Sequence, residues 1–364
     1  MKVKELCSYL DTSIPLSFQE PYDNSGLQIG NPEGEIHSAI LSFDVTEDVL
    51  DEAIAKGCGL IISHHPLIFE KIKRLNYRSS VDKIIVKSIK NDIAIYSAHT
   101  NLDNINGGVS FKMASLMGLK DIKVLSPMAG KLLKLVTYVP EGYAEKVKQA
   151  MFDVGAGEIG RYDSCSFASK GEGSFRAGKD TNPFVGQQGE LHIEKEVRIE
   201  TVVPTHLKDK VVGALLIAHP YEEVAYDIYK LENIFNEAGL GCVGEFEDSI
   251  DEKSFIGLLK NTFNKEGIRS SVFTGEKIKK VSVCGGAGIS LLENAITSGS
   301  QAFVTGDIKY HNFFEVDKRL LLVDVGHFES ENFSTEILYN LIIKKFPKFA
   351  VRFSEINTNP INYF

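Results

Sequence analysis

The chain has few cysteines, and none of them forms a paired motif. The five cysteines are widely spaced and odd in number, and no Cys-x-x-Cys occurs among Cys7, Cys58, Cys165, Cys242 and Cys284. This pattern argues against a disulfide-stapled fold, which belongs to oxidising compartments. A reducing cytoplasm is therefore the predicted location.

The sequence also lacks long apolar runs and any excess of positive charge. No run reaches the about 18 apolar residues that a membrane span needs, and residues 1–6 hold no apolar signal core. Lysine and arginine number 40 against 49 aspartates and glutamates, which gives a formal net charge of -9. Sequence-independent nucleic-acid binding needs clustered positive charge. We therefore expect neither a membrane nor a nucleic acid as partner.

Short apolar runs alternate with helical patterns in both the first and the last third of the 364 residues. Strands are predicted at 38–44, 59–63, 93–97, 280–284, 301–305, 320–324 and 350–353. Helices are predicted at about 47–56, 80–90, 108–117, 290–298 and 330–345. Uniformly apolar strands between helices indicate an α/β fold whose sheet is covered on both faces. We assign this three-layer core to residues 1–128 and 237–364.

The middle of the chain has a different texture, with dense glycine and polar residues at 155–190. Residues 136–140 form a strand-like run that ends in proline and precedes a helical pattern, and residues 201–204 begin a second unit of the same kind. This weak repeat indicates a pseudo-symmetric α+β module of ferredoxin-like type. We predict an inserted domain at 129–236; the alternative is an elaborated part of the same sheet.

Residues suited to metal binding follow several of the predicted strands. These segments contain His64-His65, His99 to Asp103, Asp307 with His311, and His327 with Glu331. In open α/β sheets, ligands bind outside the carboxyl ends of the strands. The segments therefore predict a metal site at one sheet edge.

The residue types and their spacing favour two transition-metal ions. Adjacent residues of a regular strand point to opposite faces, so His64 and His65 need a bend at the strand end, and Pro66 is consistent with one. His327 and Glu331 are spaced i, i+4 and face one point if a helix begins near them. Imidazole nitrogen and carboxylate oxygen suit zinc first, with iron, manganese or nickel as alternatives.

Each of these residues also has a structural interpretation. A single histidine at a strand end is commonly a surface or hydrogen-bonded residue. Asp103 lies in an Asn-Leu-Asp-Asn stretch that also suits a turn, and His327 with Glu331 also suits a capping pair. The convergence of several segments, not any single residue, favours the metal site.

Taken together, the motifs resemble the NIF-three-like family, known as GTP cyclohydrolase 1 type 2 homologues. The resemblance rests on Pro21 to Gln28, His64-His65-Pro66, Ser97 to Asp103, Gly306 to His311 and Gly326 to Glu331. It covers nearly the whole chain and includes the longer bacterial form, in which a PII-like domain interrupts the α/β core.

The resemblance implies a dinuclear metal centre in a toroidal homohexamer. By motif position the ligands are His64, His65, Asp103, His327 and Glu331. The family pattern implies that His65 and Asp103 favour one ion and that His64 and His327 favour the other. Glu331 bridges the two ions in this arrangement.

His99 and His311 are the candidates for catalytic acid–base work. His99, four residues before Asp103, suits either substrate contact or the orientation of a ligand. His311 suits proton donation, against a structural role. Asn24 is interpreted as a turn residue in preference to a substrate contact.

Two further motifs have both a structural and a functional interpretation. The glycine-rich turn at 285–288 suits a tight strand-to-helix connection better than a phosphate cradle, because it lacks the P-loop Lys-Ser/Thr and the dinucleotide spacing. In the insert, His219 and Glu222 suit domain packing better than metal binding.

The leading functional hypothesis is a metal-dependent hydrolase that acts on a nucleotide. The resemblance implies opening of the imidazole ring of GTP, and phosphoester hydrolysis is the alternative reaction. A second hypothesis is a non-enzymatic metal-binding regulator or metal chaperone whose insert senses a metabolite.

Overall fold

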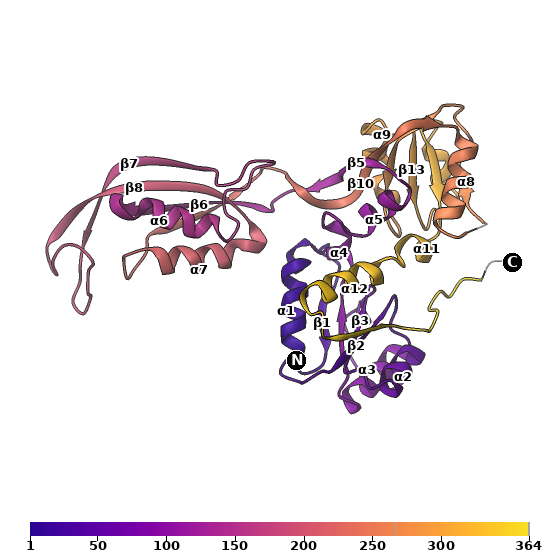
Figure 1. Cartoon of the computed structure of the whole chain (residues 1–364), viewed down its shortest axis with the longest axis horizontal. Coiled ribbons are helices and arrows are strands. Elements are labelled where there is room, and N and C mark those ends of the chain that lie inside the picture. The colour runs from indigo at the N-terminus through magenta and orange to yellow at the C-terminus, as the bar shows by residue number, and fades with distance from the viewer. Residues whose placement is uncertain (266, 363–364) are drawn as a thin grey trace. The chain divides into compact units, whose positions relative to one another are not determined.

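A parallel arrangement of short buried strands carries the N-terminal part of the fold. The computed structural model describes residues 1–265 and 267–362 and has two compact units, Met1–Pro127 with Glu237–Phe364, and Met128–Asn236 (Figure 1). In the first unit, one sheet has the strand order β1-β4-β3-β2-β15. Its strands are β1 (Gly26–Ile29), β2 (Ser38–Ser42), β3 (Leu60–Ser63), β4 (Ala94–Ser97) and β15 (Ala350–Phe353). All neighbours are parallel except β1 and β4.

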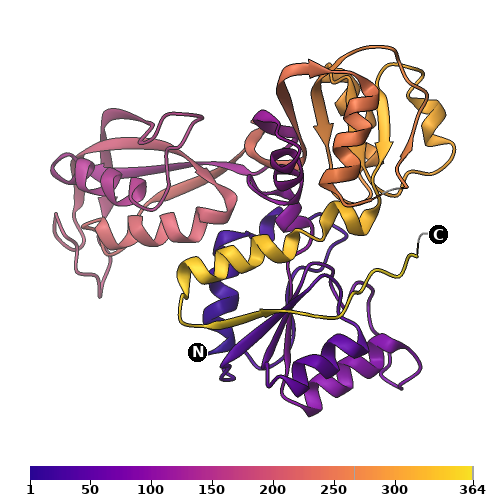
Figure 2. The same cartoon turned by 45° about the vertical axis from the view of Figure 1, so that its right-hand side comes forward.

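Side chains that alternate along these strands enter two different cores, which explains why the strands are apolar throughout. Leu41 and Ile62 pack toward α1 (Val3–Ser13) and α12 (Ser334–Lys345). Their neighbours Ile40 and Ile61 pack toward α2 (Glu47–Ala55) and α3 (Ser80–Lys90). Figure 2 shows these two helix pairs on opposite sides of the strands.

A second sheet of the same unit has the order β11-β14-β13-β12-β10-β5, with β12, β13 and β14 parallel. Its strands are β5 (Lys120–Met128), β10 (Phe235–Ile250), β11 (Arg269–Ser270), β12 (Ile278–Val283), β13 (Ala302–Thr305) and β14 (Leu321–Asp324). Helix α8 (Glu252–Thr262) packs on one face through Phe255. Helix α9 (Leu292–Thr297) packs on the other through Ala295.

Short helices fill the connections of this unit. They are α4 (Thr100–Asn104), α5 (Val109–Leu116), α10 (Asn312–Glu315), α11 (His327–Glu331) and the 3-10 turns Leu16–Phe18 and Ile289–Leu291. Several of the longer helices begin at a side chain that accepts a backbone N–H. Thr46 accepts from Val49, Ser79 from Asp82 and Asp251 from Ser254. Such N-caps typically stabilise a helix by about 1 kcal/mol.

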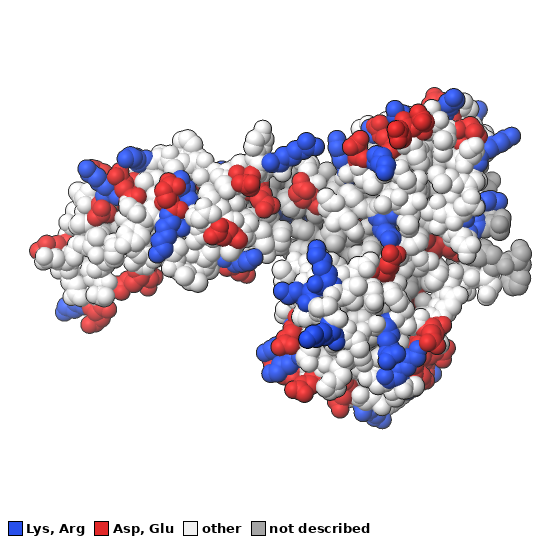
Figure 3. Space-filling view, viewed as in Figure 1, with Lys and Arg blue, Asp and Glu red and all other residues white. Residues whose placement is uncertain are grey.

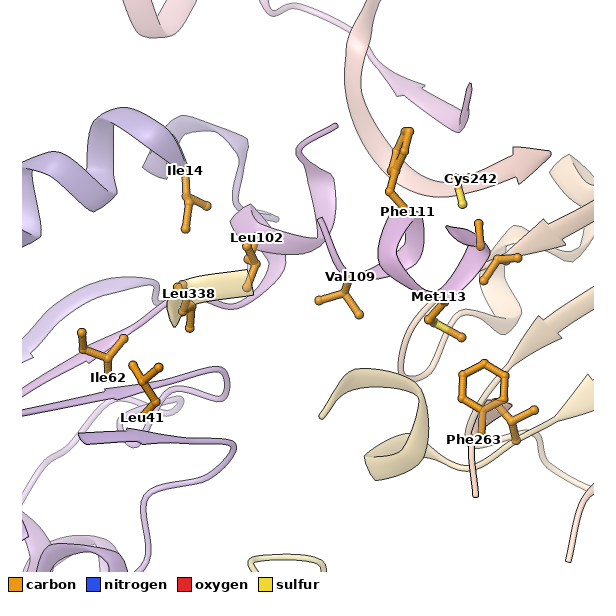
Figure 4. Packing of buried hydrophobic residues seen from close by; sticks show 14 of the residues in the cluster. Ile14, Leu41, Ile62, Leu102, Val109, Phe111, Met113, Cys242, Phe263 and Leu338 are labelled. Atoms are coloured by element: carbon orange, nitrogen blue, oxygen red, sulfur yellow. The ribbon is translucent and has the colours of Figure 1, made fainter. Parts of the chain in front are cut away.

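One hydrophobic cluster joins the two sheets. It runs from Leu41 and Ile62 through Leu102 and Val109 to residues of the second sheet, among them Cys242 on β10 (Figure 4). Burial of each such aliphatic side chain contributes roughly 1.5–3 kcal/mol. The strand ends of the two sheets are therefore held by a shared core.

The second unit has the element order β6-α6-β7-β8-α7-β9 and a four-stranded antiparallel sheet ordered β7-β8-β6-β9. This is the ferredoxin-like topology. Its elements are β6 (Leu132–Pro140), α6 (Ala144–Phe152), β7 (Ser166–Arg176), β8 (Leu191–Pro204), α7 (Lys208–Ala218), β9 (Tyr226–Leu231) and the 3-10 turns Glu141–Tyr143 and Thr205–Leu207. Both helices cover one face of the sheet (Figure 1), around a core that includes Leu135, Ile199 and Leu215.

The α/β fold class is confirmed, and the predicted helices and strands appear within a few residues of their expected bounds. The structure adds that the core of the first unit contains two sheets, a division that the strand pattern does not reveal. None of the helices among the described residues has the length and apolar character of a membrane span. On the face seen in Figure 3, acidic and basic side chains are interspersed.

Candidate metal centre

The candidate site lies where the carboxyl ends of parallel strands from both sheets of the first unit meet. Strand β3 leads directly into His64-His65, β4 is followed by His99, and β14 is followed by His327. Both sheets therefore present polar residues at the edge where ligands bind in α/β proteins. These are the strand ends whose polar residues the sequence analysis singles out.

A sharp bend after β3 brings the two adjacent imidazoles to the same side. The backbone N–H groups of His64 and His65 both donate to the carbonyl of Phe43, over 3.2 and 3.1 Å. The Ser63 hydroxyl holds the carbonyl oxygen of His65 at 2.8 Å. As a result the His64 and His65 rings lie 5.1 Å apart, centre to centre.

The remaining members of the site come from two short helices. Asp103 lies on α4, and α11 carries His327 and Glu331 one turn apart. Gly326 precedes α11 with φ of 91°, a left-handed conformation that favours glycine. Helix α11 therefore begins at His327, which places its i, i+4 pair on one face.

The donor atoms form overlapping groups around Glu331. Within each of the groups His65-His327-Glu331, His64-Asp103-Glu331 and His64-His65-His99, the candidate ligand atoms lie within 4.8 Å of one another. Glu331 Oε2 lies 2.8 Å from His327 Nε2, 3.3 Å from His65 Nε2 and 3.6 Å from His64 Nε2. Glu331 is thus a member of two of the three groups.

The grouping differs from the one that the resemblance implies. His65 lies nearest His327, with 3.2 Å between their Nε2 atoms, whereas Asp103 Oδ1 lies 3.8 Å from His64 Nε2. The expected pairing of His65 with Asp103, and of His64 with His327, is therefore not the arrangement that the side chains adopt. The bend after β3, which the Phe43 carbonyl anchors, turns His65 toward α11 and leaves His64 beside α4.

Every histidine of the cluster has its Nδ1 atom bound to an oxygen, which leaves Nε2 facing the other donors. The Nδ1 partners are the carbonyl of Ala98 for His64 (2.9 Å), Asp44 for His65 (2.7 Å), Asp23 for His99 (2.8 Å) and Asp307 for His327 (2.8 Å). A proton on Nδ1 satisfies each of these oxygens and leaves the Nε2 lone pair free. Metal-binding histidines are commonly oriented in this way.

Buried donor atoms without hydrogen-bond partners support the same interpretation. Among the described residues, His64 Nε2, Asp103 Oδ1 and Glu331 Oε2 are buried and lack a partner of regular geometry, although Glu331 Oε2 is close enough to His327 for an ion pair. Leaving such atoms unpaired costs about 1–3 kcal/mol each. A divalent cation among them would satisfy all three atoms, so the residues fit a metal site.

The carboxylates control the protonation of the cluster. Burial alone would lower the pKa of His65, but Asp44 and Glu331 outweigh it and raise the pKa to about 10. Burial likewise opposes the effect of Glu331 and Asp307 on His327, whose pKa rises to about 9. Although burial disfavours the charge on Glu331, its close contacts with the histidines hold its pKa well below the usual range.

His99 is held by a buried aspartate that the sequence analysis did not single out as a functional residue. Asp23 Oδ1 accepts from His99 Nδ1, while Oδ2 accepts the backbone N–H of Thr100 at 3.0 Å and the Ser25 hydroxyl at 3.0 Å. Burial alone would raise the pKa of Asp23, but hydrogen bonds from His99 and Thr100 hold it well below its usual range. Asp23 therefore stays ionised and fixes the ring of His99.

Other candidates lie outside the cluster. His311 is exposed and contacts the rings of Tyr310 and Phe314, and it belongs to none of the ligand groups found among the described residues. A catalytic role for His311 stays a prediction. Asn24 donates to the carbonyl of Ile68 at 2.6 Å, as suits a residue that fixes a turn.

In the second unit, His219 is bound on both ring nitrogens. Nε2 donates to the carbonyl of Tyr138 at 2.9 Å, and Nδ1 accepts the backbone N–H of Tyr221 at 3.1 Å. Glu222 accepts the backbone N–H of Asn182 at 3.0 Å. These contacts agree with the structural role preferred for His219 and Glu222.

The glycine-rich turn after β12 has a function that the sequence does not reveal. A Cβ atom at Gly286 would overlap the Glu331 carboxylate, and one at Gly285 would lie 3.2 Å from Glu331 Cγ. The Gly286 N–H donates to the hydroxyl of Ser330 at 2.9 Å, which ties the turn to α11. The turn therefore makes room for the carboxylate that the ligand groups share.

Gly286→Ala is expected to lower metal affinity by about tenfold or more, because the new methyl group displaces Glu331. Metal content after purification without added metal is the measurement. Gly299→Ala is the matched control, since Gly299 also has a positive φ, of 76°, but nothing within 4 Å of the added Cβ. Equal metal loss in both variants would attribute the effect to backbone strain and contradict the role given to Gly286.

Known proteins resemble this chain over its whole length. It is 38% identical to the Bacillus subtilis "GTP cyclohydrolase 1 type 2 homolog" over 365 residues, covering 99% of this chain and 98% of that protein. The protein of the same name from Halalkalibacterium halodurans is 41% identical over 315 residues, or 86% and 85% of the two chains.

A solved structure and a family profile agree with these relatives. The crystal structure of a Bacillus cereus protein related to NIF3 superposes with a TM-score of 0.86 at 36% identity, covering 100% of this chain and 99% of that one. The profile of the Duf34/NIF3 (NGG1p interacting factor 3) family matches residues 1–360. By fold, by sequence and by the motifs at its strand ends, this chain belongs to the Duf34/NIF3 family.

Proposed function

We propose that the protein is a metal-dependent hydrolase that acts on a nucleotide and holds two divalent ions per chain. The observation that carries this proposal is the shared orientation of the histidines, whose Nδ1 atoms are bound while their Nε2 atoms converge on Glu331. The proposed ligands are His64, His65, Asp103, His327 and Glu331. Zinc suits these donors, with iron, manganese and nickel as alternatives.

Two ions held there would activate a water molecule and polarise the substrate atom under attack. The chain's own contribution is acid–base chemistry and orientation. His99 Nε2 faces the cluster while Asp23 fixes Nδ1, so His99 is placed to take a proton from the attacking water and return it to the leaving atom. The relatives' name favours the imidazole ring of GTP as the target.

A nucleotide assay separates the possible activities. Metal-reconstituted protein is incubated with GTP and with other nucleotides and phosphoesters, and loss of the guanine chromophore is recorded apart from phosphate release. Chromophore loss supports ring opening, and phosphate release alone supports phosphoester hydrolysis. Full metal occupancy without turnover would sink the enzymatic proposal and favour a metal-binding regulator or metal chaperone.

Replacing His99 by alanine is expected to lower turnover about 10²-fold or more while metal content is retained, because the variant removes the proton acceptor but none of the five proposed ligands. Asp23→Asn should lower turnover in the same direction, because an amide holds the ring less firmly. His37→Ala, at an exposed histidine, is the control.

His311→Ala tests the second acid–base candidate in the same assay. Unchanged turnover in His311→Ala would remove His311 from the proposal, and unchanged turnover in His99→Ala would remove the proton transfer assigned to His99.

For the assembly, we propose a cytoplasmic homohexamer in which residues 129–236 form an inserted PII-like domain. Family resemblance supports this assembly, and all five cysteines are free thiols, as suits a reducing compartment. Light scattering of the eluting protein gives the oligomer mass, and a monomer or dimer at micromolar concentration would contradict the hexamer.

A further inference from the structure

The ferredoxin-like unit contains a cavity of about 620 Å³ that the metal chemistry does not use. It lies on the face of the sheet opposite α6 and α7, since Tyr138, Gly171 and Glu196 line it and their strand neighbours face the helices. The segment around Phe184 and the one around Tyr221 form its sides. Cavities of this size hold small organic ligands.

Glycines form the floor of the cavity on β7. A Cβ atom at Gly173 would overlap the carboxylate of Glu196, whereas one at Gly171 would meet nothing within 4 Å. The absence of a side chain at Gly173 lets Glu196 lie flat against the sheet. The absence of one at Gly171 leaves open space on the same strand.

Glu196 is largely buried, and its carboxylate lines the cavity. The residue is 9% exposed, and Oε1 accepts the hydroxyl of Tyr221 at 3.0 Å. Within the described residues, Oε2 has neither a hydrogen bond nor an ion pair, and it is not among the fully buried unpartnered atoms. An accessible carboxylate oxygen at the edge of an aromatic cavity can accept N–H groups from a ligand.

Aromatic rings form the wall above this carboxylate. The ring of Tyr221 lies 6.0 Å from Phe175 and 6.2 Å from Phe184, with interplanar angles of 59° and 48°. His219 fixes the backbone of Tyr221 to that of Tyr138 on β6, so the wall is already in place. Rings in this arrangement provide faces on which a flat heterocycle stacks.

Basic side chains contribute to the lining of the same cavity. Lys170, Arg176 and Arg198 belong to it, beside the acidic residues Glu172, Glu222 and Glu223. Glu200 orients Arg198 at 3.0 Å and Lys170 pairs with Glu141 at 3.3 Å, whereas no ion pair is found for Arg176 within the described residues. A guanidinium beside an aromatic pocket binds phosphate or carboxylate groups. The cavity therefore combines a stacking wall, a carboxylate acceptor and cationic groups.

We propose that this cavity binds a planar heteroaromatic ligand with adjacent N–H donors on one edge and an anionic substituent, the chemistry of a guanine nucleotide. The donor edge meets Glu196, the ring stacks on the aromatic wall, and the anionic group lies toward the basic residues. This site is separate from the metal centre and does not depend on the proposed hydrolysis.

The test is calorimetric titration of the full chain, kept metal-free with a chelator, against guanosine 5′-monophosphate. We expect saturable binding that Glu196→Gln weakens by about tenfold or more, because an amide presents one acceptor and no charge to the donor edge. Glu194→Gln is the matched control, since Glu194 lies on the same strand but binds His192 at 2.9 Å and does not line the cavity. It should bind as the unaltered protein does.

A second variant keeps the proposal testable if Glu196→Gln unfolds. Phe184 is 47% exposed, so Phe184→Ala removes a stacking face without emptying a core, and we expect weaker binding there too. Because the chain contains no tryptophan, a fluorescent guanine analogue gives an independent readout.

Absence of guanosine monophosphate binding, or equal affinity in Glu196→Gln, would overturn the site. Equal binding of adenosine monophosphate, which lacks the paired donors, would overturn the role of Glu196. Binding of tetramethylammonium in place of the nucleotide would identify a cation cage and overturn the ligand class.

Discussion

Glu331→Gln is expected to be purified with almost no bound metal. An amide has one neutral acceptor oxygen and cannot serve both ligand groups that share the Glu331 carboxylate. The loss of affinity should exceed the roughly 10- to 100-fold that removal of an outer partner costs. Elemental analysis of protein purified without added metal measures the effect, and any hydrolytic turnover should disappear with the metal.

The control for this variant is Glu336→Gln on α12. Glu336 is exposed and pairs with Lys112 at 2.9 Å, and exposed pairs of this kind contribute at most about 1 kcal/mol to stability. It should retain its metal and its melting temperature. Metal content that stays unchanged in Glu331→Gln would show that the shared carboxylate is not a ligand, and the dinuclear proposal would fail.

Metal binding is expected to release more than two protons per chain near pH 7. With pKa values of about 10 and about 9, His65 and His327 hold protons in the metal-free protein, and Asp103, whose pKa burial raises to about 7, is partly protonated as well. Apparent affinity should therefore rise more than 100-fold per pH unit near pH 7, about 100-fold per unit from there to about pH 9, more slowly to about pH 10, and then level off. Calorimetry in buffers of different ionisation enthalpy counts the released protons.

The same histidines give the metal-free protein a pH-dependent stability. Because their pKa values are raised in the folded state, the stabilisation from their protonated forms is complete below the ordinary value of 6.5 and is lost as the pH rises through 9 and 10. Thermal unfolding of protein kept metal-free with a chelator should show this fall in stability. The melting temperature of metal-loaded protein should not fall in the same pH range. A release of no protons at pH 7 would contradict the protonation assigned to the cluster.

The strand ends of the site could be predicted from sequence because each is a local pattern. An apolar run followed by His64-His65, and a helix start beside His327, are visible within a few residues of chain. Pro66 predicts the bend at the two histidines, but the carbonyl that anchors it, that of Phe43, lies just after another strand, β2. The local sequence predicts that the chain bends here, but it does not identify the group that accepts the hydrogen bonds of the bend.

The residues that orient the ligands could not be found in the same way. Asp44 reaches His65 from 21 residues away and Asp23 reaches His99 from 76 residues away, so only the fold reveals these pairs. Asp44 also ends a run that was assigned entirely to a strand, which hid its position at the sheet edge. The division of the core into two sheets was missed because strand patterns carry no information about their neighbours.

The placement of the cluster between the two sheets has a consequence for how it is built during translation. His64, His65 and Asp103 leave the ribosome early, whereas His327 and Glu331 emerge only after the whole of Met128–Asn236 and every strand of the second sheet. A nascent or prematurely terminated chain therefore carries an incomplete set of donors. The full constellation exists only in a polypeptide that has been synthesised past Glu331.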